Sequence, residues 1–222
     1  MISVIRIDPA GIPFVTCVWV PAAILLIFKQ VIMSLPLVMI GCVFLFFFRD
    51  PDRRPPLDPQ VIVAPADGQV MHVGDVDESL TVTGEWYQIS IFLSPLNVHV
   101  NRIPVGGRIT RVKHRKGKFW AAYKKKASVE NEATEVWIDH EGQTVICRQI
   151  VGVLARRIVC RLDAGTEVQT GQRFGIMKFG SRMDVFMPRS AVLKIATGET
   201  VRGGETVLAI LEETTRIKEL RS

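Results

Sequence analysis

Apolar residues dominate positions 12–48, and only Lys29 and Gln30 clearly divide them. The two pieces, Ile12–Phe28 and Val31–Phe48, are each close to the minimum length that crosses a bilayer as a helix. Arginines stand on both sides of the pair, and such residues favour the cytoplasmic side of a membrane. The pattern therefore predicts that residues 1–48 form a helical hairpin that anchors the chain to a membrane, with both ends in the cytoplasm.

Other forms of this anchor stay open. Pro21 and Pro36 would kink the helices, so a shallow re-entrant anchor is an alternative to two full spans. A hairpin buried in the core of a soluble domain ranks third. A cleaved signal peptide fits less well, because the apolar stretch is too long and no small-residue cleavage pattern follows it. Residues 49–60, rich in proline and charge, predict a linker.

Short runs of β-forming residues, punctuated by glycine, begin after the linker. Strands this short and frequent indicate antiparallel pairing rather than alternation with helices. Residues 61–222 are therefore predicted to be mainly β, an antiparallel sandwich or barrel with few helices. The expected strands are Val61–Ala64, Gly68–Val73, Trp86–Leu93, Asn97–Asn101, Gly107–Val112, Glu135–His140, Thr144–Val151 and Arg157–Leu162.

An internal repeat stands near the C-terminus. The segment from Gly165 to Gly171 is echoed by the segment from Gly198 to Gly204, 33 residues later. The two segments predict similar turn-and-strand units on either side of residues 180 and 181.

The chain is both basic and apolar, with a net charge of +6, a pI near 9.4 and 48% hydrophobic residues. This combination favours an anionic membrane surface over nucleic acid as a partner. The four cysteines lack the paired spacing of a zinc site. Neither a disulfide framework nor a zinc site is therefore expected.

Nine lysines and arginines, and no acidic residue, lie between Arg108 and Lys126, interleaved with Phe119, Trp120 and Tyr123. A solvated basic face, a groove for single-stranded nucleic acid and a segment among lipid headgroups are three interpretations of this stretch. The apolar N-terminal stretch of the same chain favours the lipid interpretation and places nucleic acid last.

The dipeptide Gly180-Ser181 is a candidate for self-cleavage. Glycine can present its carbonyl in a strained turn, where the Ser181 hydroxyl would attack it in an N-to-O acyl shift. Elimination of the ester would leave dehydroalanine, which hydrolyses to a pyruvoyl group and ammonia. Taken alone, this dipeptide more often marks an ordinary turn.

Two further residues are candidates for the chemistry of this site. His99 shares one face of a predicted strand with Asn97 and Asn101, and Asp67 precedes a glycine after a proline. Each also has an ordinary explanation, as part of an exposed strand face or of a turn. Neither residue alone identifies a function.

Several motifs follow one another along the β domain. They are Pro65-Ala66-Asp67-Gly68, Leu93-Ser94-Pro95 with Val98-His99, Gly117-Lys118-Phe119, Asn131-Glu132 and Phe179-Gly180-Ser181-Arg182. In this order they resemble the motifs of the phosphatidylserine decarboxylases, in their short, archaeal-type form. The resemblance runs from about Asp50 to about Gly204, and the apolar anchor stands in its expected place.

The resemblance implies a proenzyme that cuts itself between Gly180 and Ser181. The products would be a β chain, residues 1–180, and an α chain, residues 181–222. Ser181 would become a covalent pyruvoyl cofactor, and neither a metal nor pyridoxal phosphate is expected. The implied reaction is decarboxylation of phosphatidylserine to phosphatidylethanolamine and CO2, through a Schiff base with the substrate amine.

The resemblance assigns His99 as the base that activates Ser181 and as a later proton donor. Asp67 would orient its imidazole, as in a catalytic triad. Longer, bacterial-type members carry a second histidine three positions after the first, where this chain has Arg102. The tasks of that histidine must fall on His99 or on another group, for which His114 is one candidate.

The implied substrate lies in a bilayer, so the site must reach the lipid. The candidate residues for substrate or membrane binding are Arg115, Lys116, Lys118 and Trp120. The expected location is the cytoplasmic face of the cell (inner) membrane, reached peripherally or through the N-terminal anchor. The sequence leaves open whether the chain forms a homo-oligomer.

Two rival functions remain. A membrane-bound serine hydrolase would use Ser181, His99 and Asp67 with the backbone intact, although the Gly-x-Ser-x-Gly motif is missing. A non-enzymatic, biotinyl- or lipoyl-like carrier domain would be modified at Lys178. Such domains usually have methionine on both sides of the lysine, whereas Phe179 follows it here.

Overall fold

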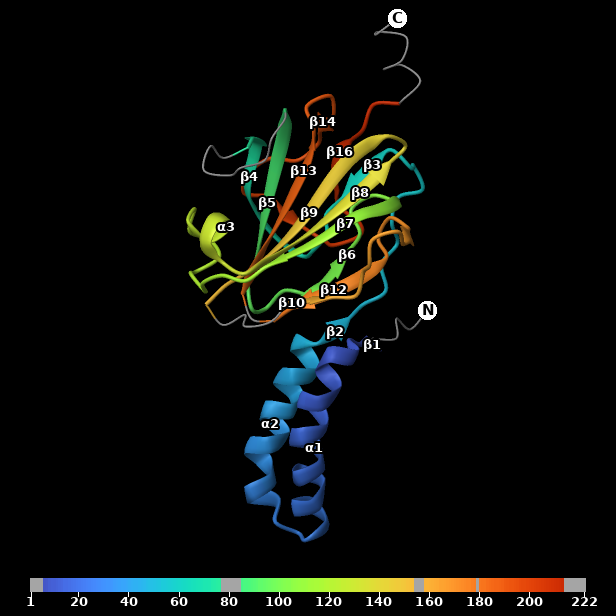
Figure 1. Cartoon of the computed structure of the whole chain (residues 1–222). Coiled ribbons are helices and arrows are strands. Elements are labelled where there is room, and N and C mark those ends of the chain that lie inside the picture. The colour runs from blue at the N-terminus through green and yellow to red at the C-terminus, as the bar shows by residue number, and fades with distance from the viewer. Residues whose placement is uncertain (1–5, 77–84, 154–157, 179, 214–222) are drawn as a thin grey trace, which may run out of the picture. The chain divides into compact units, whose positions relative to one another are not determined.

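The computed structural model describes residues 6–76, 85–153, 158–178 and 180–213 (Figure 1). The chain divides into two compact units, Met1–Asp52 and Arg53–Ser222. In the described residues the first unit is mainly helical and the second is mainly β.

Two apolar helices dominate the N-terminal unit. Its elements are β1 (Arg6–Ile7), the 3-10 helix η1 (Pro9–Gly11), α1 (Ile12–Ile27), α2 (Val31–Phe47) and β2 (Arg49–Asp50). Lys29 turns the chain between the helices with φ of 59°. A Cβ on Gly41 would lie 2.6 Å from Nε1 of Trp19, so this glycine lets α1 and α2 approach closely.

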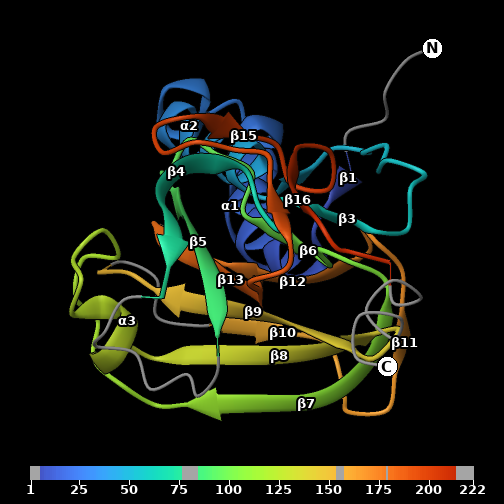
Figure 2. The ribbon, with the colours of Figure 1, turned by 90° about the horizontal axis from the view of Figure 1, so that it is seen from above.

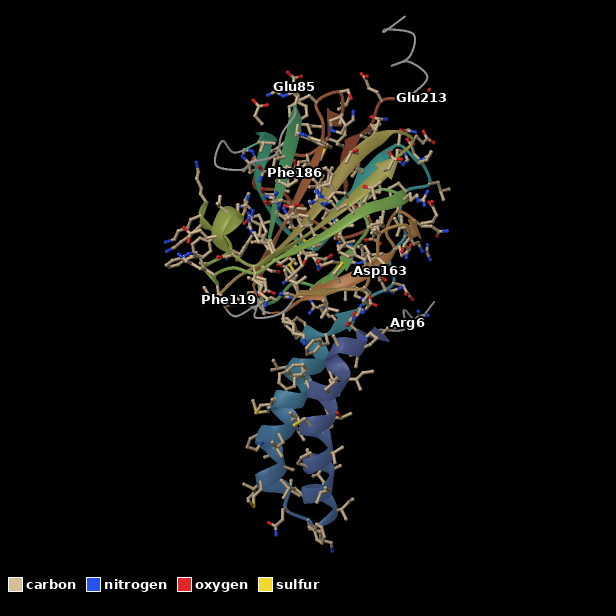
Figure 3. All side chains as sticks on the ribbon, viewed as in Figure 1. Arg6, Glu85, Phe119, Asp163, Phe186 and Glu213 are labelled. Atoms are coloured by element: carbon tan, nitrogen blue, oxygen red, sulfur yellow. The ribbon has the colours of Figure 1, made fainter. Side chains whose placement is uncertain are left out.

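The surface of this helical unit is largely apolar, as the mostly carbon side chains along α1 and α2 show (Figure 3). Among the described residues, the stretch Pro9–Ile27 is long and apolar enough to cross a bilayer, and Val31–Phe47 is shorter. The length and composition of Pro9–Ile27 agree with the predicted N-terminal apolar helix.

The β-rich unit is built from antiparallel sheets, which confirms the predicted fold class. The described strands form one eight-stranded sheet, β11-β7-β8-β9-β13-β5-β4-β15, and two three-stranded sheets, β10-β12-β6 and β14-β16-β3. The large sheet curls from β7 through β13 to β4 (Figure 2). The elements are β3 (Val61–Val63), β4 (Gly68–Asp75), β5 (Trp86–Leu93), β6 (Val100–Arg102), β7 (Gly107–Arg115), α3 (Ala127–Glu130), β8 (Ala133–His140), β9 (Gln143–Val151), β10 (Ile158–Cys160), β11 (Glu167–Val168), β12 (Arg173–Met177), β13 (Ser181–Pro188), β14 (Val192–Leu193), β15 (Thr200–Val201) and β16 (Val207–Ile210).

Strand β13 runs through the middle of the large sheet, between β9 and β5. Its residues Met183, Val185 and Met187 alternate along the strand and belong to the main hydrophobic core. Because side chains two apart share a face of a strand, Ser181 lies on the same inner face. The fold therefore directs this serine toward the interior.

The internal repeat corresponds to the two edges of the large sheet. One copy contains β11, which pairs with β7, and the other contains β15, which pairs with β4. The glycines that bound each copy all have positive φ, between 77° and 95°. They are Gly165, Gly171, Gly198 and Gly204.

The predicted strand Asn97–Asn101 is shorter in the structure. Residues 94–97 form a turn, in which the Ser94 N–H donates to Oδ1 of Asn97 at 2.9 Å and the Asn97 N–H donates to the Ser94 carbonyl at 3.0 Å. Strand β6 begins only at Val100. The turn chemistry of serine, proline and asparagine outweighs the alternation that suggested a longer strand.

Candidate active site

Ser181 is the first residue of β13 and is fully buried. It pairs with Leu93 of β5 on one side and with Val151 of β9 on the other. Within the described part of the chain, its Oγ has no hydrogen-bond partner. Burying a hydroxyl in this way costs about 1–3 kcal/mol. A catalytic role is one explanation for a buried hydroxyl without a hydrogen-bond partner.

Gly180, the residue before it, has φ of 71°. This left-handed conformation costs residues with a Cβ about 1–2 kcal/mol and is readily adopted by glycine. The space beside the glycine is open, since a built Cβ meets no atom of the described residues within 4 Å. The backbone conformation, not crowding, therefore explains why glycine stands at this position.

The imidazole of His99 lies beside this peptide and is fully buried. The Gly180 N–H donates to Nε2 of His99 at 3.5 Å, the long end of the hydrogen-bonding range. Nδ1 lies 2.9 Å from the Asn97 carbonyl oxygen. Because a carbonyl only accepts, this contact assigns the proton to Nδ1 and leaves the Nε2 lone pair directed toward the Gly180-Ser181 segment.

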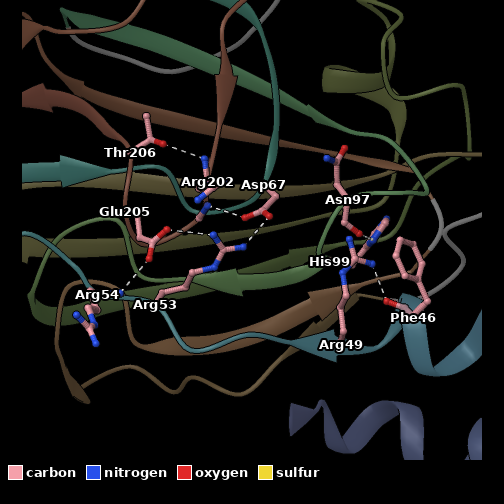
Figure 4. Close-up of polar contacts among 11 residues, drawn as sticks. Phe46, Arg49, Arg53, Arg54, Asp67, Asn97, His99, Arg202, Glu205 and Thr206 are labelled. Carbon is pink, nitrogen blue, oxygen red and sulfur yellow. Dashed lines mark hydrogen bonds and ion pairs between the residues drawn. The ribbon is translucent and has the colours of Figure 1, made fainter. Parts of the chain in front are cut away.

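Asp67 contacts Arg53 and Gly203 and not His99, the partner predicted for it (Figure 4). Its carboxylate accepts from Nη2 of Arg53 at 2.8 Å and from the Gly203 N–H at 2.7 Å. Arg53 also reaches Glu205 at 3.1 Å. The structure thus brings His99 and Ser181 together, but the contact predicted between Asp67 and His99 Nδ1 is replaced by one with Asn97.

Arg182 fixes the strand directly after the serine. Its side chain is buried on the other face of β13, where Nε lies 2.6 Å from Oδ1 of Asp184 and Nη2 donates to Oγ of Ser90 at 2.9 Å. Ser90 in turn accepts from Gln88 at 2.9 Å. These contacts join β13 to β5 through side chains as well as through the backbone ladder.

The basic and aromatic stretch is tied to the same end of the sheet by Asn131. This buried side chain accepts from the Trp120 N–H at 2.8 Å, and its Nδ2 donates to the Trp120 carbonyl at 2.7 Å and to the Val151 carbonyl at 2.8 Å. Val151 is also the strand partner of Ser181. One amide therefore holds the segment around Trp120 against the strand beside the serine.

The candidate lipid-binding residues have unequal roles. Nη2 of Arg115 donates to the carbonyls of Ser128 and Asn131, both at 3.1 Å, so this guanidinium supports local structure. Burial, followed by repulsion from Arg148, lowers the pKa of Arg115.

Lys118 and Trp120 both contact Glu130, each at 2.9 Å. The hydrogen bond from Lys118, followed by that from Trp120, lowers the pKa of Glu130. Lys126 lies 3.4 Å from the centre of the Trp120 ring. The Trp120 ring is therefore held between basic and acidic side chains.

Comparison with known proteins identifies the family. Residues 40–209 match the family model for phosphatidylserine decarboxylase. The chain belongs to the phosphatidylserine decarboxylase family. Among curated relatives, the "Phosphatidylserine decarboxylase proenzyme" of Salinibacter ruber is 48% identical over 74% of this chain and 74% of its own length. The proenzymes of the same name from Chlorobium phaeobacteroides and Wolbachia pipientis are 44% and 43% identical, over 74% and 76% of this chain and 77% and 75% of their own lengths.

Membership of the decarboxylase family confirms the resemblance read from the motifs. Arg102 occupies the position at which the resemblance to longer members led us to expect a second histidine. Nη1 of Arg102 donates to the Gly171 carbonyl at 3.1 Å, and its buried side chain packs on Gly204. This arginine therefore joins the ends of the two repeat copies.

His114 lies far from the serine along the sheet. It is on β7, two strands beyond β9, and β13 is the next strand after β9. Three strand spacings amount to about 14 Å. Its Nδ1 lies 3.0 Å from Oγ1 of Thr134 and its Nε2 lies 3.8 Å from Glu132. The structure does not bring this histidine to the Gly180-Ser181 segment.

Two sets of contacts were not predicted from the sequence: the one between the His99 ring and the Asn97 carbonyl, and the pairing of Arg182 with Asp184 and Ser90. The hydrogen bond from His99 uses a backbone carbonyl, which every residue carries, so residue type gives no signal for it. The alternation of Arg182 and Asp184 on one strand was a usable signal, since two charged residues on a buried strand require partners.

Proposed function

We propose that this chain is a proenzyme that cuts itself between Gly180 and Ser181 and then decarboxylates phosphatidylserine to phosphatidylethanolamine and CO2. The observation that carries the proposal is the contact between His99 Nε2 and the Gly180 N–H, beside a buried Ser181 Oγ without a partner among the described residues. Membership of the phosphatidylserine decarboxylase family supports the substrate and the reaction.

Self-cleavage would begin at the serine hydroxyl. Nε2 of His99 takes the hydroxyl proton while Oγ of Ser181 forms a bond to the Gly180 carbonyl carbon. The bond from that carbon to the Ser181 nitrogen then breaks, and the nitrogen takes up a proton. Loss of the Ser181 α-proton with rupture of the Cβ–Oγ bond releases Gly180 as a carboxylate and leaves dehydroalanine. Hydrolysis of its imine tautomer consumes one water and releases ammonia.

The residues present fit a pyruvoyl group at this position. Gly180 already has a left-handed backbone conformation that glycine adopts readily, and the serine side chain that would be converted is buried on the inner face of β13. When formed, the group supplies an electrophilic carbonyl that binds the substrate amine and accepts the electron pair left as CO2 departs. His99 is placed to return a proton to the substrate carbon. Asp67 enters the proposal as a positioning residue that fixes Arg53 and Gly203.

The lipid surface would be met by loops at the serine end of the sheet. Leu96 follows β5 and Val153 follows β9, the two strands that flank Ser181, and their exposed fractions are 73% and 56%. Tyr123 is 59% exposed and its ring lies 6.2 Å from that of Phe92 on β5. Phe119 lies at the periphery of the β-rich unit (Figure 3). Exposed apolar residues beside lysines fit an anionic bilayer.

The function is tested by incubating the purified full-length protein with vesicles that contain phosphatidylserine. We expect equal amounts of CO2 and phosphatidylethanolamine, and loss of activity after treatment with a carbonyl reagent. Release of a fatty acid or of a free headgroup would favour the serine hydrolase instead. A prosthetic-group mass on Lys178 would favour the carrier. The structure speaks against the carrier, because β12 and β13, which flank Lys178, belong to different sheets and do not form a hairpin.

The lipid surface is tested by the double substitution Phe119→Ser and Tyr123→Ser. Each substitution removes apolar contact with the bilayer worth about 1 kcal/mol or more, so we expect the apparent KM for vesicle phosphatidylserine to rise about tenfold or more. The rise in KM for a soluble short-chain substrate should be smaller. Val192→Ser is the matched control, because Val192 is 50% exposed on β14. An equal rise in KM for both substrates would contradict a role at the lipid surface.

A further inference from the structure

Gly152 lies against the carbonyl that self-cleavage would break. It directly follows Val151, the β9 partner of Ser181. A Cβ built on Gly152 would lie 2.1 Å from the Gly180 oxygen and 3.1 Å from the Gly180 carbonyl carbon. Its φ is not among the positive values, so the backbone conformation alone would accept another residue. The close approach of two backbones is therefore the reason for glycine here.

The surroundings of Gly152 prevent an easy escape from such a clash. The same built Cβ would lie 3.4 Å from Cβ of Ala122, which is buried. Ala122 belongs to the segment that Asn131 fastens to Val151 through the Trp120 backbone. An added methyl group at residue 152 would therefore be enclosed between the Gly180 carbonyl and Ala122, and no side-chain rotation could remove it.

We propose that Gly152 is a positioning residue for self-cleavage. Its missing side chain allows the Gly180 carbonyl to lie where Oγ of Ser181 can reach the carbonyl carbon. The inference rests on the proposed cleavage, in which the Oγ–C bond forms and the C–N bond breaks. A methyl group at residue 152 would have to move the Gly180 oxygen by about 1 Å, a misplacement that can cost about 100-fold in rate.

The test is Gly152→Ala in the full-length chain, with conversion of the uncut chain followed by denaturing electrophoresis and intact mass. We expect the rate constant of processing to fall about 100-fold and turnover per pyruvoyl group formed to fall by a much smaller factor. A general folding defect would lower both together and would also lower the Tm. Gly106→Ala is the matched control, because the nearest atom to its built Cβ is a backbone oxygen at 3.3 Å. We expect its processing to stay within about threefold of wild type, since a few tenths of an ångström can be absorbed.

A second variant keeps the proposal testable if Gly152→Ala does not fold. Ala122→Val adds bulk from the opposite side of Gly152 and leaves the glycine in place, so it should slow processing by a smaller but measurable factor. Wild-type processing rates in folded Gly152→Ala, or in Ala122→Val where the first variant fails to fold, would overturn the role of Gly152. An uncut wild-type chain would instead remove the proposed function, so the two failures are distinguishable.

Discussion

Ser181→Ala should leave one uncut chain without decarboxylase activity. Alanine has no β-oxygen to accept the acyl group or to be eliminated, so neither the strand break nor the pyruvoyl group can form. The variant should still fold, because the hydroxyl that it removes has no hydrogen-bond partner among the described residues. Electrophoresis under denaturing conditions and a phosphatidylethanolamine assay measure both effects.

Ser190→Ala is the control for this substitution, because Ser190 lies in the turn that follows β13. It should be processed at the wild-type rate. Decarboxylase activity in uncut Ser181→Ala would show that the chemistry does not depend on this serine. Appearance of the two fragments in that variant would show that another residue breaks the chain.

His99→Ala should slow processing by about 10²–10⁴-fold, the usual contribution of a positioned general base. The imidazole is the group whose unprotonated nitrogen faces the Gly180-Ser181 segment, and the Asn97 carbonyl holds it in that tautomer. The measurement is the rate at which the uncut chain disappears after synthesis. Normal processing in this variant would require a different base for Ser181.

Asp67→Asn is the informative companion to His99→Ala. The carboxylate contacts Arg53 and Gly203, so its loss should affect the base only through the positions of those groups. We expect Asp67→Asn to slow processing by a smaller factor than His99→Ala does. Equal effects of the two substitutions would show that the carboxylate acts directly on the imidazole during cleavage, as the triad interpretation has it.

Much of the fold followed from local patterns. The apolar runs predicted α1 and α2 to within a residue or two, because hydrophobic stretches bounded by charges mark helix ends clearly. Frequent short β runs predicted the antiparallel class. The pairing order of the eight-stranded sheet could not be predicted, because β13 joins β5 and β9 from distant parts of the sequence. The repeat hinted at two equivalent units, and the structure places them at opposite edges of that sheet.

The sequence predicted which residues belong to the candidate site, but not which contacts they make. Gly180, Ser181 and His99 were named from the motifs, and the structure brings them together. The partner of the imidazole was misassigned, because the turn at Asn97 presents a carbonyl that residue type does not reveal. The position of Gly152 beside the site could not be predicted from the sequence for a related reason. A glycine after a strand usually marks a turn, and only the three-dimensional structure shows that Gly152 lies against the Gly180 carbonyl.

The intact mass of the purified wild-type protein tests the central claim most directly. Self-cleavage predicts two chains, one ending in the carboxylate of Gly180 and one beginning at residue 181. The second chain should be lighter, by the mass of one ammonia, than the same fragment beginning with serine. A single uncut chain of 222 residues that decarboxylates phosphatidylserine would contradict the account.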